Sequence, residues 1–255
     1  MKTITLAIPF YNTSKYFLNA IKYAIDDDFV SEICVTDDRS TSDEWKKLND
    51  IVSNLNNDKV KIYRNTENLK PFRSKYNAVF NSSNEWVYLL DSDNHMFEDS
   101  IELIKKIPDD DPSIVYSPQN LYCKHDNVEE YEVISDYDFK YDEIGLEEIK
   151  DLLFKKHKWG RWFINSGNYI VNKNSYLSAL EKPFEDVSTE WLHADTAASF
   201  YFLLKSGIRF KVVKDLKHHH TVRPESTWNA CGENSHKSVN FYHDKIINLY
   251  EDEIY

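Results

Sequence analysis

Glycine is scarce in this sequence, at 5 of 255 residues, where a typical chain has ~7%. A fold that depends on several glycine-rich phosphate loops is therefore disfavoured. Basic residues are outnumbered, 31 against 43 acidic ones, so the formal net charge is −12. This balance argues against nucleic-acid binding, which draws on clustered Lys and Arg, and we expect no nucleic-acid partner. The same charge would repel a free anionic substrate unless a cation stands between the two.

Cysteine and long apolar runs are also lacking. The three cysteines, Cys34, Cys123 and Cys231, are far apart, with neither metal-ligand spacing nor a disulfide pattern. A reducing compartment, the cytoplasm, is therefore expected. The first apolar run ends at Pro9, and no stretch approaches ~18 apolar residues. We expect a cytoplasmic protein without a transmembrane segment.

Alternating strand and helix patterns fill the first ~115 residues. Strands separated by amphipathic helices are characteristic of α/β folds with a mostly parallel central sheet flanked by helices. The fourth expected strand is almost wholly apolar, as strands in the middle of such sheets are. The expected strands cover residues 3–8, 32–36, 60–63, 86–90 and 114–117.

The second half of the chain is less regular and richer in Asp, Glu and Tyr. A long helical pattern ends at Gly207, a residue type that commonly terminates helices. We expect one domain over residues 1–255, with halves 1–117 and 118–255. The elements expected here are strands at 131–134, 163–171 and 209–213 and helices at 146–154, 189–206 and about 239–249.

Acidic residues follow two of the expected strands. Asp37 and Asp38 come directly after the second strand. Asp91 and Asp93 come directly after the fourth. Ligands of parallel α/β sheets bind at this edge, and a carboxylate pair there needs neutralising. A hard divalent cation completed by phosphate oxygens would do so, although turn or cap roles are the commoner explanation of an isolated Asp-x-Asp.

Three segments together resemble a known family: Leu6–Asn12 (LAIPFYN), Val35–Thr41 (VTDDRST) and Leu89–Asn94 (LLDSDN). In order and spacing they are similar to family-2 glycosyltransferases of the GT-A fold, well over residues 3 to about 115 and more loosely beyond. The resemblance implies a Rossmann-like nucleotide-diphospho-sugar transferase fold. It also implies an inverting enzyme that uses Mn²⁺ or Mg²⁺, a UDP-sugar donor and a hydroxyl of a glycan or other acceptor.

The resemblance also assigns residues to the nucleotide half, 1–117. Tyr11 matches the residue that packs on the nucleobase, and Asp38 the carboxylate that accepts a uracil N–H. Asp93 matches the metal ligand. Lys75 lies near a basic position that reaches a phosphate or the base, although a solvated helix lysine is an equal alternative. The nucleotide-binding set is Pro9, Tyr11, Asp38, Lys75, Asp91 and Ser92.

The family's catalytic base is an Asp about a dozen residues before a Gly, in the acceptor and catalytic half. Asp195 stands twelve residues before Gly207 and is the predicted base, although Ala194 replaces the usual Glu. Glu190 and Asp186 are alternatives. The alternative to a catalytic role is that Asp195 is a first-turn residue that only interacts with the helix dipole.

Further site residues are expected near the end of the chain. Strand alternation would put His218 and His220 on one face, where a neutral imidazole can complete a Mn²⁺ shell, unless they form only a polar strand end. Arg223 would contact the diphosphate.

The segment Ser166, Gly167 and Asn168, in the middle of the chain, would shape the donor-sugar or acceptor pocket, or form a plain turn.

Departures from the family keep alternatives open. Arg39 and Lys70 stand where the family often has Gly. The bulkier Arg39 would alter the nucleotide pocket, which leaves the identity of the nucleobase open. Such losses also leave room for a degenerate domain that binds nucleotide or glycan without turnover. A sugar-phosphate nucleotidyltransferase would need a Gly- and Arg-rich loop after the first strand. An aspartyl phosphatase would need Thr or Val after its Asp-x-Asp, where this chain has Asn94.

Overall fold

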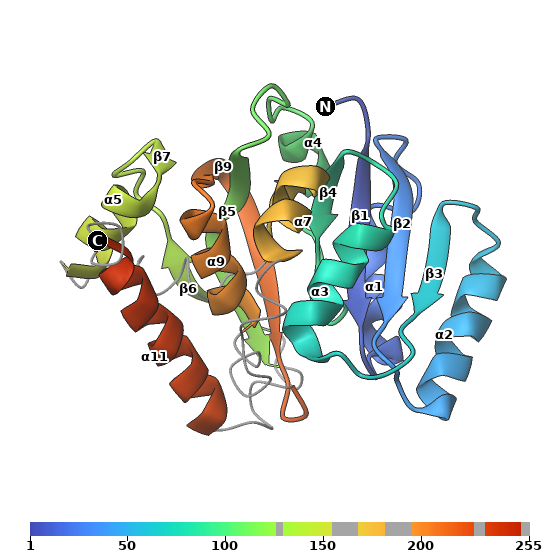
Figure 1. Ribbon diagram of the computed structural model, residues 1–255. Helices are drawn as coiled ribbons and strands as arrows, with labels where there is room; N and C mark the ends of the chain where they lie inside the picture. The colour runs from blue at the N-terminus through green and yellow to red at the C-terminus, as the bar shows by residue number, and fades with distance from the viewer. Residues whose placement is uncertain (126–129, 155–167, 182–194, 227–232, 251–255) are drawn as a thin grey trace.

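The computed structural model describes residues 1–125, 130–154, 168–181, 195–226 and 233–250 (Figure 1). The described strands form one nine-stranded sheet in the order β3-β2-β1-β4-β8-β5-β9-β7, with β6 paired to β5. The strands are β1 (Ile4–Phe10), β2 (Val30–Asp37), β3 (Val60–Arg64), β4 (Trp86–Leu89), β5 (Ile114–His125), β6 (Glu132–Asp136), β7 (Glu143–Ile144), β8 (Ile170–Asn172) and β9 (Arg209–Val222). The helices are α1 (Ser14–Ile21), α2 (Ser42–Leu55), α3 (Lys70–Asn81), α4 (Ser100–Ile104), α5 (Leu146–Phe154), α7 (Lys173–Glu181), α9 (Asp195–Lys205) and α11 (Glu233–Ile247), followed by the short 3₁₀ helix η2 (Asn248–Tyr250).

The two parts of the sheet differ in direction. Strands β3, β2, β1 and β4 are all parallel, as the alternating pattern predicted. Beyond β4 the sheet is mixed, because β8 runs antiparallel to both β4 and β5 and β7 runs antiparallel to β9. The carboxyl ends of β1, β2 and β4 therefore meet at one edge of the sheet, where the sequence placed the candidate ligands.

Helices cover both faces of the sheet and create two apolar layers. Successive residues of β1 alternate between them: Leu6 and Ile8 face one layer and Ala7 the other. The first layer is closed by α1, α2 and α4, through residues such as Phe17 and Leu48. The second is closed by α3, α7, α9 and α11, of which α3, α7 and α9 lie in front of the sheet in Figure 1. Helices α3 and α9 are thus held on the same face.

Helix α2 begins at Ser42, and the Thr41 side chain caps it by accepting a hydrogen bond from the Glu44 N–H. Two local predictions for the second half of the chain are confirmed. Helix α5 has the bounds expected from its periodicity. Gly207 follows α9 with a φ of 76°, the left-handed geometry that ends helices. No described helix is long and apolar enough to cross a membrane.

The predicted late strand is too short. Strand β9 continues to Val222, so His218, His219 and His220 lie within it rather than after it. It pairs with an equally extended β5 in two stretches, separated by a register shift between Pro118 and Asn120. Residue 117 is therefore inside β5, and the expected border between the halves does not coincide with a break in structure.

An aromatic cluster supports this extension of β5 and β9. The His219 ring stacks on His95 at 3.6 Å between centroids and meets Phe97 and Tyr131 edge-on. Burial lowers the pKa of His219 to about 3 and that of His95 to about 4, so both rings are neutral at neutral pH. The sequence also gave no indication of α7, and most of the strand expected at 163–171 lies outside the described residues.

Candidate active site

A cavity of about 700 Å³ opens at the carboxyl ends of β1, β2 and β4. The starts of α3 and α9 and the end of β9 complete its walls. Strands and helices far apart in sequence therefore contribute to one site. The predicted site residues that line it are Pro9, Tyr11, Asp38, Lys75, Asp91, Ser92, Asp93, Asp195, His220 and Arg223.

The group around Asp38, here called the Asp38 group, is held by neutral donors. The Asp38 carboxylate is only 3% exposed and accepts the Asn65 side-chain N–H and the Leu69 backbone N–H, both at 2.8 Å through Oδ1. Burial raises its pKa, while those hydrogen bonds oppose the rise. Tyr11, which lines the same cavity, is 44% exposed. A planar nucleobase could stack on the exposed Tyr11 ring, and its ring N–H could donate to the buried Asp38 carboxylate.

The loops of this group have unusual backbone geometry. Asn12, Arg39 and Lys70 have φ values of 53°, 64° and 70°, the left-handed region that favours glycine. Asn12 also ties two loops together, because its N–H donates to Ser40 Oγ at 2.9 Å and its Oδ1 accepts the Thr41 N–H at 3.0 Å. Arg39 and Lys70 thus adopt glycine-type backbone geometry without being glycine. Such strain typically clusters at functional sites.

A second group, here called the Lys75 group, consists of Lys75, Asp91 and Asp195. The Lys75 ammonium lies 2.9 Å from Asp91 Oδ1 and 2.6 Å from Asp195 Oδ2. Burial alone would lower the pKa of Lys75, but the charges of Asp195 and Asp91 outweigh it and raise that pKa above its ordinary value. Burial raises the pKa of Asp91, and Lys75 opposes the rise. The group therefore joins α3, the end of β4 and the first turn of α9.

Asp93 is paired with the second predicted cation. Arg223 Nε lies 2.6 Å from Asp93 Oδ2, and the Arg223 guanidinium stands 5.9 Å from the centre of the Tyr16 ring. The Thr221 hydroxyl donates to the backbone carbonyl of Asp93, and the Thr221 N–H donates to Asn94 Oδ1. The end of β9 is thereby fastened to the loop that carries the Asp-x-Asp motif.

The predicted histidine pair is divided between cavity and interior. The rings of His218 and His220 lie 6.2 Å apart, but only His220 is exposed and lines the cavity. His218 is buried and contacts Asn168 through Nδ1 at 2.5 Å. Burial, with the His220 and His219 rings adding to it, holds the pKa of His218 well below its usual value.

Asn168, predicted to shape the pocket, lies behind the cavity wall. It is fully buried, and its side chain accepts the Asp91 N–H as well as contacting His218, so it supports the site from behind instead of lining the cavity. The other predicted pocket residues, Ser166 and Gly167, lie outside the described residues, as do Ala194 and the alternative bases Glu190 and Asp186.

Comparison with a family model decides the family. The model described as Glycosyl transferase family 2 matches residues 5–173, which is more than half of the 255-residue chain. The chain belongs to glycosyl transferase family 2. The predicted family and the prediction of a glycosyltransferase are thereby confirmed. A comparison with curated protein sequences gives no match.

Solved structures share the fold of this family-2 chain. S. aureus TarS 1–349 in complex with UDP-GlcNAc superposes with a TM-score of 0.61 at 18% identity, covering 96% of this chain and 67% of that one. GalNAc-T7 with UDP, GalNAc and Mn²⁺ gives a TM-score of 0.63 at 16% identity, covering 96% and 50%. The chain spans 40% of a longer TarS structure. At such identities the likeness establishes the GT-A fold alone, which confirms the predicted fold class.

The family-2 cavity offers oxygen and nitrogen ligands to a metal ion. Asp93 and His220 both line it, and Mn²⁺ accepts carboxylate and imidazole ligands. No cluster of three such side chains occurs within the described ranges, so the remaining positions would fall to phosphate oxygens and water. The donor set fits a metal held jointly by protein and diphosphate, provided that Arg223 releases Asp93.

Sequence reasoning missed the segment that follows β3. Asn65 and Leu69 hold Asp38, while Asn68 and Ser74 line the cavity. Polar residues after a parallel strand were the signal used for the other strands of this family-2 sheet. The same rule, applied to the end of β3, would have found them.

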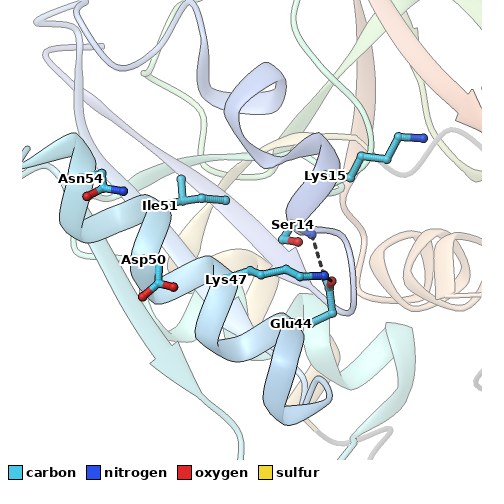
Figure 2. A pocket seen from close by; sticks show the side chains of 7 residues that line it. All are labelled: Ser14, Lys15, Glu44, Lys47, Asp50, Ile51 and Asn54. Carbon is cyan, nitrogen blue, oxygen red and sulfur yellow. Dashed lines mark hydrogen bonds and ion pairs between the residues drawn. The ribbon is translucent and has the colours of Figure 1, made fainter.

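A second, more open hollow of about 440 Å³ lies between α1 and α2 (Figure 2). Glu44 stands at its edge, where it accepts the Ser14 N–H at 3.1 Å and pairs with Lys47 at 2.7 Å. Glu44 also lines the main cavity. It therefore braces the wall between the two hollows, and its contacts explain why the pKa of Glu44 is lowered against the effect of burial.

Proposed function

We propose that this chain is an inverting, metal-dependent glycosyltransferase that moves a sugar from UDP to a hydroxyl of a glycan or similar acceptor. The observation that carries the proposal is one cavity lined by Asp195 of α9 and by Asp91 and Asp93 of the β4 loop, about a hundred residues earlier in the chain. One carboxylate in such a cavity could take the proton of an acceptor hydroxyl, and another could hold a metal ion beside the diphosphate.

Uridine is the favoured nucleoside because of the Asp38 group. The uracil ring presents an N–H, which the ionised Asp38 carboxylate would accept, while the exposed Tyr11 ring would stack on the base. TarS and GalNAc-T7 structures contain UDP or UDP-GlcNAc, which supports the same donor class for this chain.

The reaction would be a single displacement. The acceptor oxygen forms a bond to the anomeric carbon while the bond from that carbon to the phosphate oxygen breaks. The acceptor proton goes to Asp195, and the electron pair of the broken bond leaves with UDP. Asp93, with His220, would hold Mn²⁺ or Mg²⁺, whose charge stabilises the departing diphosphate. Arg223, once released from Asp93, would add a second positive charge there.

The proposal is tested by thermal-shift measurements with UDP, ADP, GDP and CDP, each with and without Mn²⁺. A ligand that binds only the folded state raises the melting temperature with concentration. We expect the largest rise for UDP with Mn²⁺, and loss of the metal-dependent part in Asp93→Asn. Asp142→Asn is the matched control, because Asp142 is an 83% exposed carboxylate on the distant β7 side.

Equal responses to all four nucleotides, or no response, would contradict the donor assignment. A UDP response that is unchanged in Asp93→Asn would contradict the metal site. Inversion is checked separately, because the anomeric configuration of the product, measured by NMR, must be opposite to that of the donor.

A further inference from the structure

Lys75 is a buried cation in the cavity wall. It is 5% exposed, and its ammonium bridges two carboxylates that come from different halves of the chain. Asp91 follows β4 on the donor side, and Asp195 opens α9. A lysine that only contacted a phosphate would present its ammonium to solvent, whereas this one is already held by two anions.

The geometry points to Lys75 as a positioning residue, one that fixes the Asp195 carboxylate against Asp91, so that the base is in place when the donor is bound. This inference rests on the proposed function, since it takes Asp195 as the base. It differs from the nucleotide contact expected from the sequence, because Lys75 would act on the base and not on the donor.

The two contacts of the ammonium support the role. Lys75 lies 2.6 Å from Asp195 and 2.9 Å from Asp91, so its removal leaves the Asp195 carboxylate without the contact that sets its position. A base displaced from the acceptor hydroxyl is a poor proton acceptor. A lost bridge would therefore impair the base without removing any atom that touches the donor.

Neutral hydrogen bonds hold the backbone of the same residue. The Ser199 hydroxyl donates to the backbone carbonyl of Asp195 at 2.8 Å, and Ser199 also bonds the hydroxyl of the buried Tyr176. These bonds fix the first turn of α9, and Lys75 fixes the carboxylate itself. A base whose backbone and carboxylate are both held is pre-organised for proton transfer.

The test combines kinetics with a double-mutant cycle. The Lys75→Met variant keeps most of the length of the side chain but removes the ammonium. We expect its kcat, measured as UDP release from the best-used UDP-sugar, to fall ~100-fold or more. The Kd for UDP with Mn²⁺ should change less than about threefold. Lys75→Arg, which can still bridge two carboxylates, should recover at least a tenth of the lost rate. Lys75→Gln serves as the second variant if the Met variant does not fold.

The double-mutant cycle measures the coupling energy between Lys75 and Asp195 in the protein without ligand. Denaturant unfolding of Lys75→Met, Asp195→Asn and the double variant should show strong coupling, with Lys75→Met costing much less stability once Asp195 is neutral. A variant that weakens UDP binding more than tenfold while keeping kcat at saturation would overturn the inference in favour of a donor contact. Additive stabilities would overturn it as well. Absence of any turnover by the wild-type protein would instead contradict the proposed function, and the cycle would still decide whether the bridge exists.

Discussion

The Asp38 group and the Lys75 group both present carboxylates to one cavity, a buried one in the first and two half-buried ones in the second, and they hold them in different ways. Asp38 is bound by an amide and a backbone N–H, which are neutral. Asp91 and Asp195 are bound by an ammonium, and Asp93 by a guanidinium. Neutral donors leave the Asp38 carboxylate with a net negative charge, whereas the cations balance the charge of the carboxylates that they contact. Under the proposed function, the Asp38 group would recognise the nucleotide and the Lys75 group would serve the reaction.

The largest effect is expected at the reaction side. Asp195→Asn keeps the size of the side chain but removes the proton acceptor, so kcat should fall by ~10²–10⁴. The Kd for UDP should change little, because the donor does not need the base. The measurement is initial-rate UDP release together with calorimetric titration of UDP. Full activity in Asp195→Asn would show that the base lies elsewhere, and Asp142→Asn controls for the loss of one surface charge.

A smaller effect is expected at the recognition side. Asp38→Asn replaces an ionised acceptor with an amide, and UDP affinity should weaken ~10–100-fold, the usual worth of a charge-assisted hydrogen bond. Cytosine has an acceptor where uracil has the N–H, so the affinity for CDP should fall less than the affinity for UDP. The ratio of UDP to CDP affinity should therefore become smaller in Asp38→Asn. Calorimetric titration of both nucleotides measures this. An unchanged ratio of UDP to CDP affinity would contradict the role of Asp38.

The same residue predicts the direction of a pH effect. Because burial raises the pKa of Asp38, its carboxylate becomes protonated at a higher pH than an ordinary aspartate as the pH falls. Uridine binding, which needs the ionised form, should weaken through that range. Asp38→Asn should not show this step.

These differences also explain how much could be read from the sequence. Tyr11, Asp38 and Asp93 follow single strands, so local pattern and a family resemblance were enough to find them. Asp195 was found by its spacing from Gly207. The contacts of Lys75 with Asp91 and Asp195 join three elements, and no local pattern contains that information.

The second half was harder because tertiary pairing overrides local signals there. Asp215, with a φ of 65°, interrupts the alternation of β9, and pairing with β5 resumes beyond it. The sequence pattern therefore ended the strand too early and left His218 to His220 outside it. Burial of Asn168 likewise depends on His218 and on the Asp91 backbone, which only the folded chain brings together.

A prediction at the metal side has a readout that needs no turnover. Arg223 holds Asp93, so Arg223→Gln should free the carboxylate and strengthen Mn²⁺ binding several-fold in the absence of nucleotide, on the scale of a partly exposed ion pair. Electron paramagnetic resonance of free Mn²⁺ measures the affinity, and Arg209→Gln, which leaves two other acids unpaired, is the control. Equal or weaker Mn²⁺ binding by Arg223→Gln would contradict competition for Asp93.

The smallest expected effect concerns backbone strain in the Asp38 group. Arg39→Gly should stabilise the fold by ~0.5–1 kcal/mol, because an exposed residue with a φ of 64° pays a steric cost that glycine avoids. The free energy of unfolding in urea measures this. Lys61→Gly, at an exposed position of β3, should instead destabilise. Destabilisation by Arg39→Gly would show that the side chain contributes more than the strain costs.

The most direct test of the two-group account is a crystal structure of the chain with UDP and Mn²⁺. The account predicts the uracil ring on Tyr11 with its N–H toward Asp38, the diphosphate and Mn²⁺ at Asp93, and Arg223 released from that carboxylate. The Lys75 bridge to Asp195 should remain intact. Uracil bound away from Asp38, or a diphosphate that breaks the contact between Lys75 and Asp195, would contradict the division between recognition and reaction.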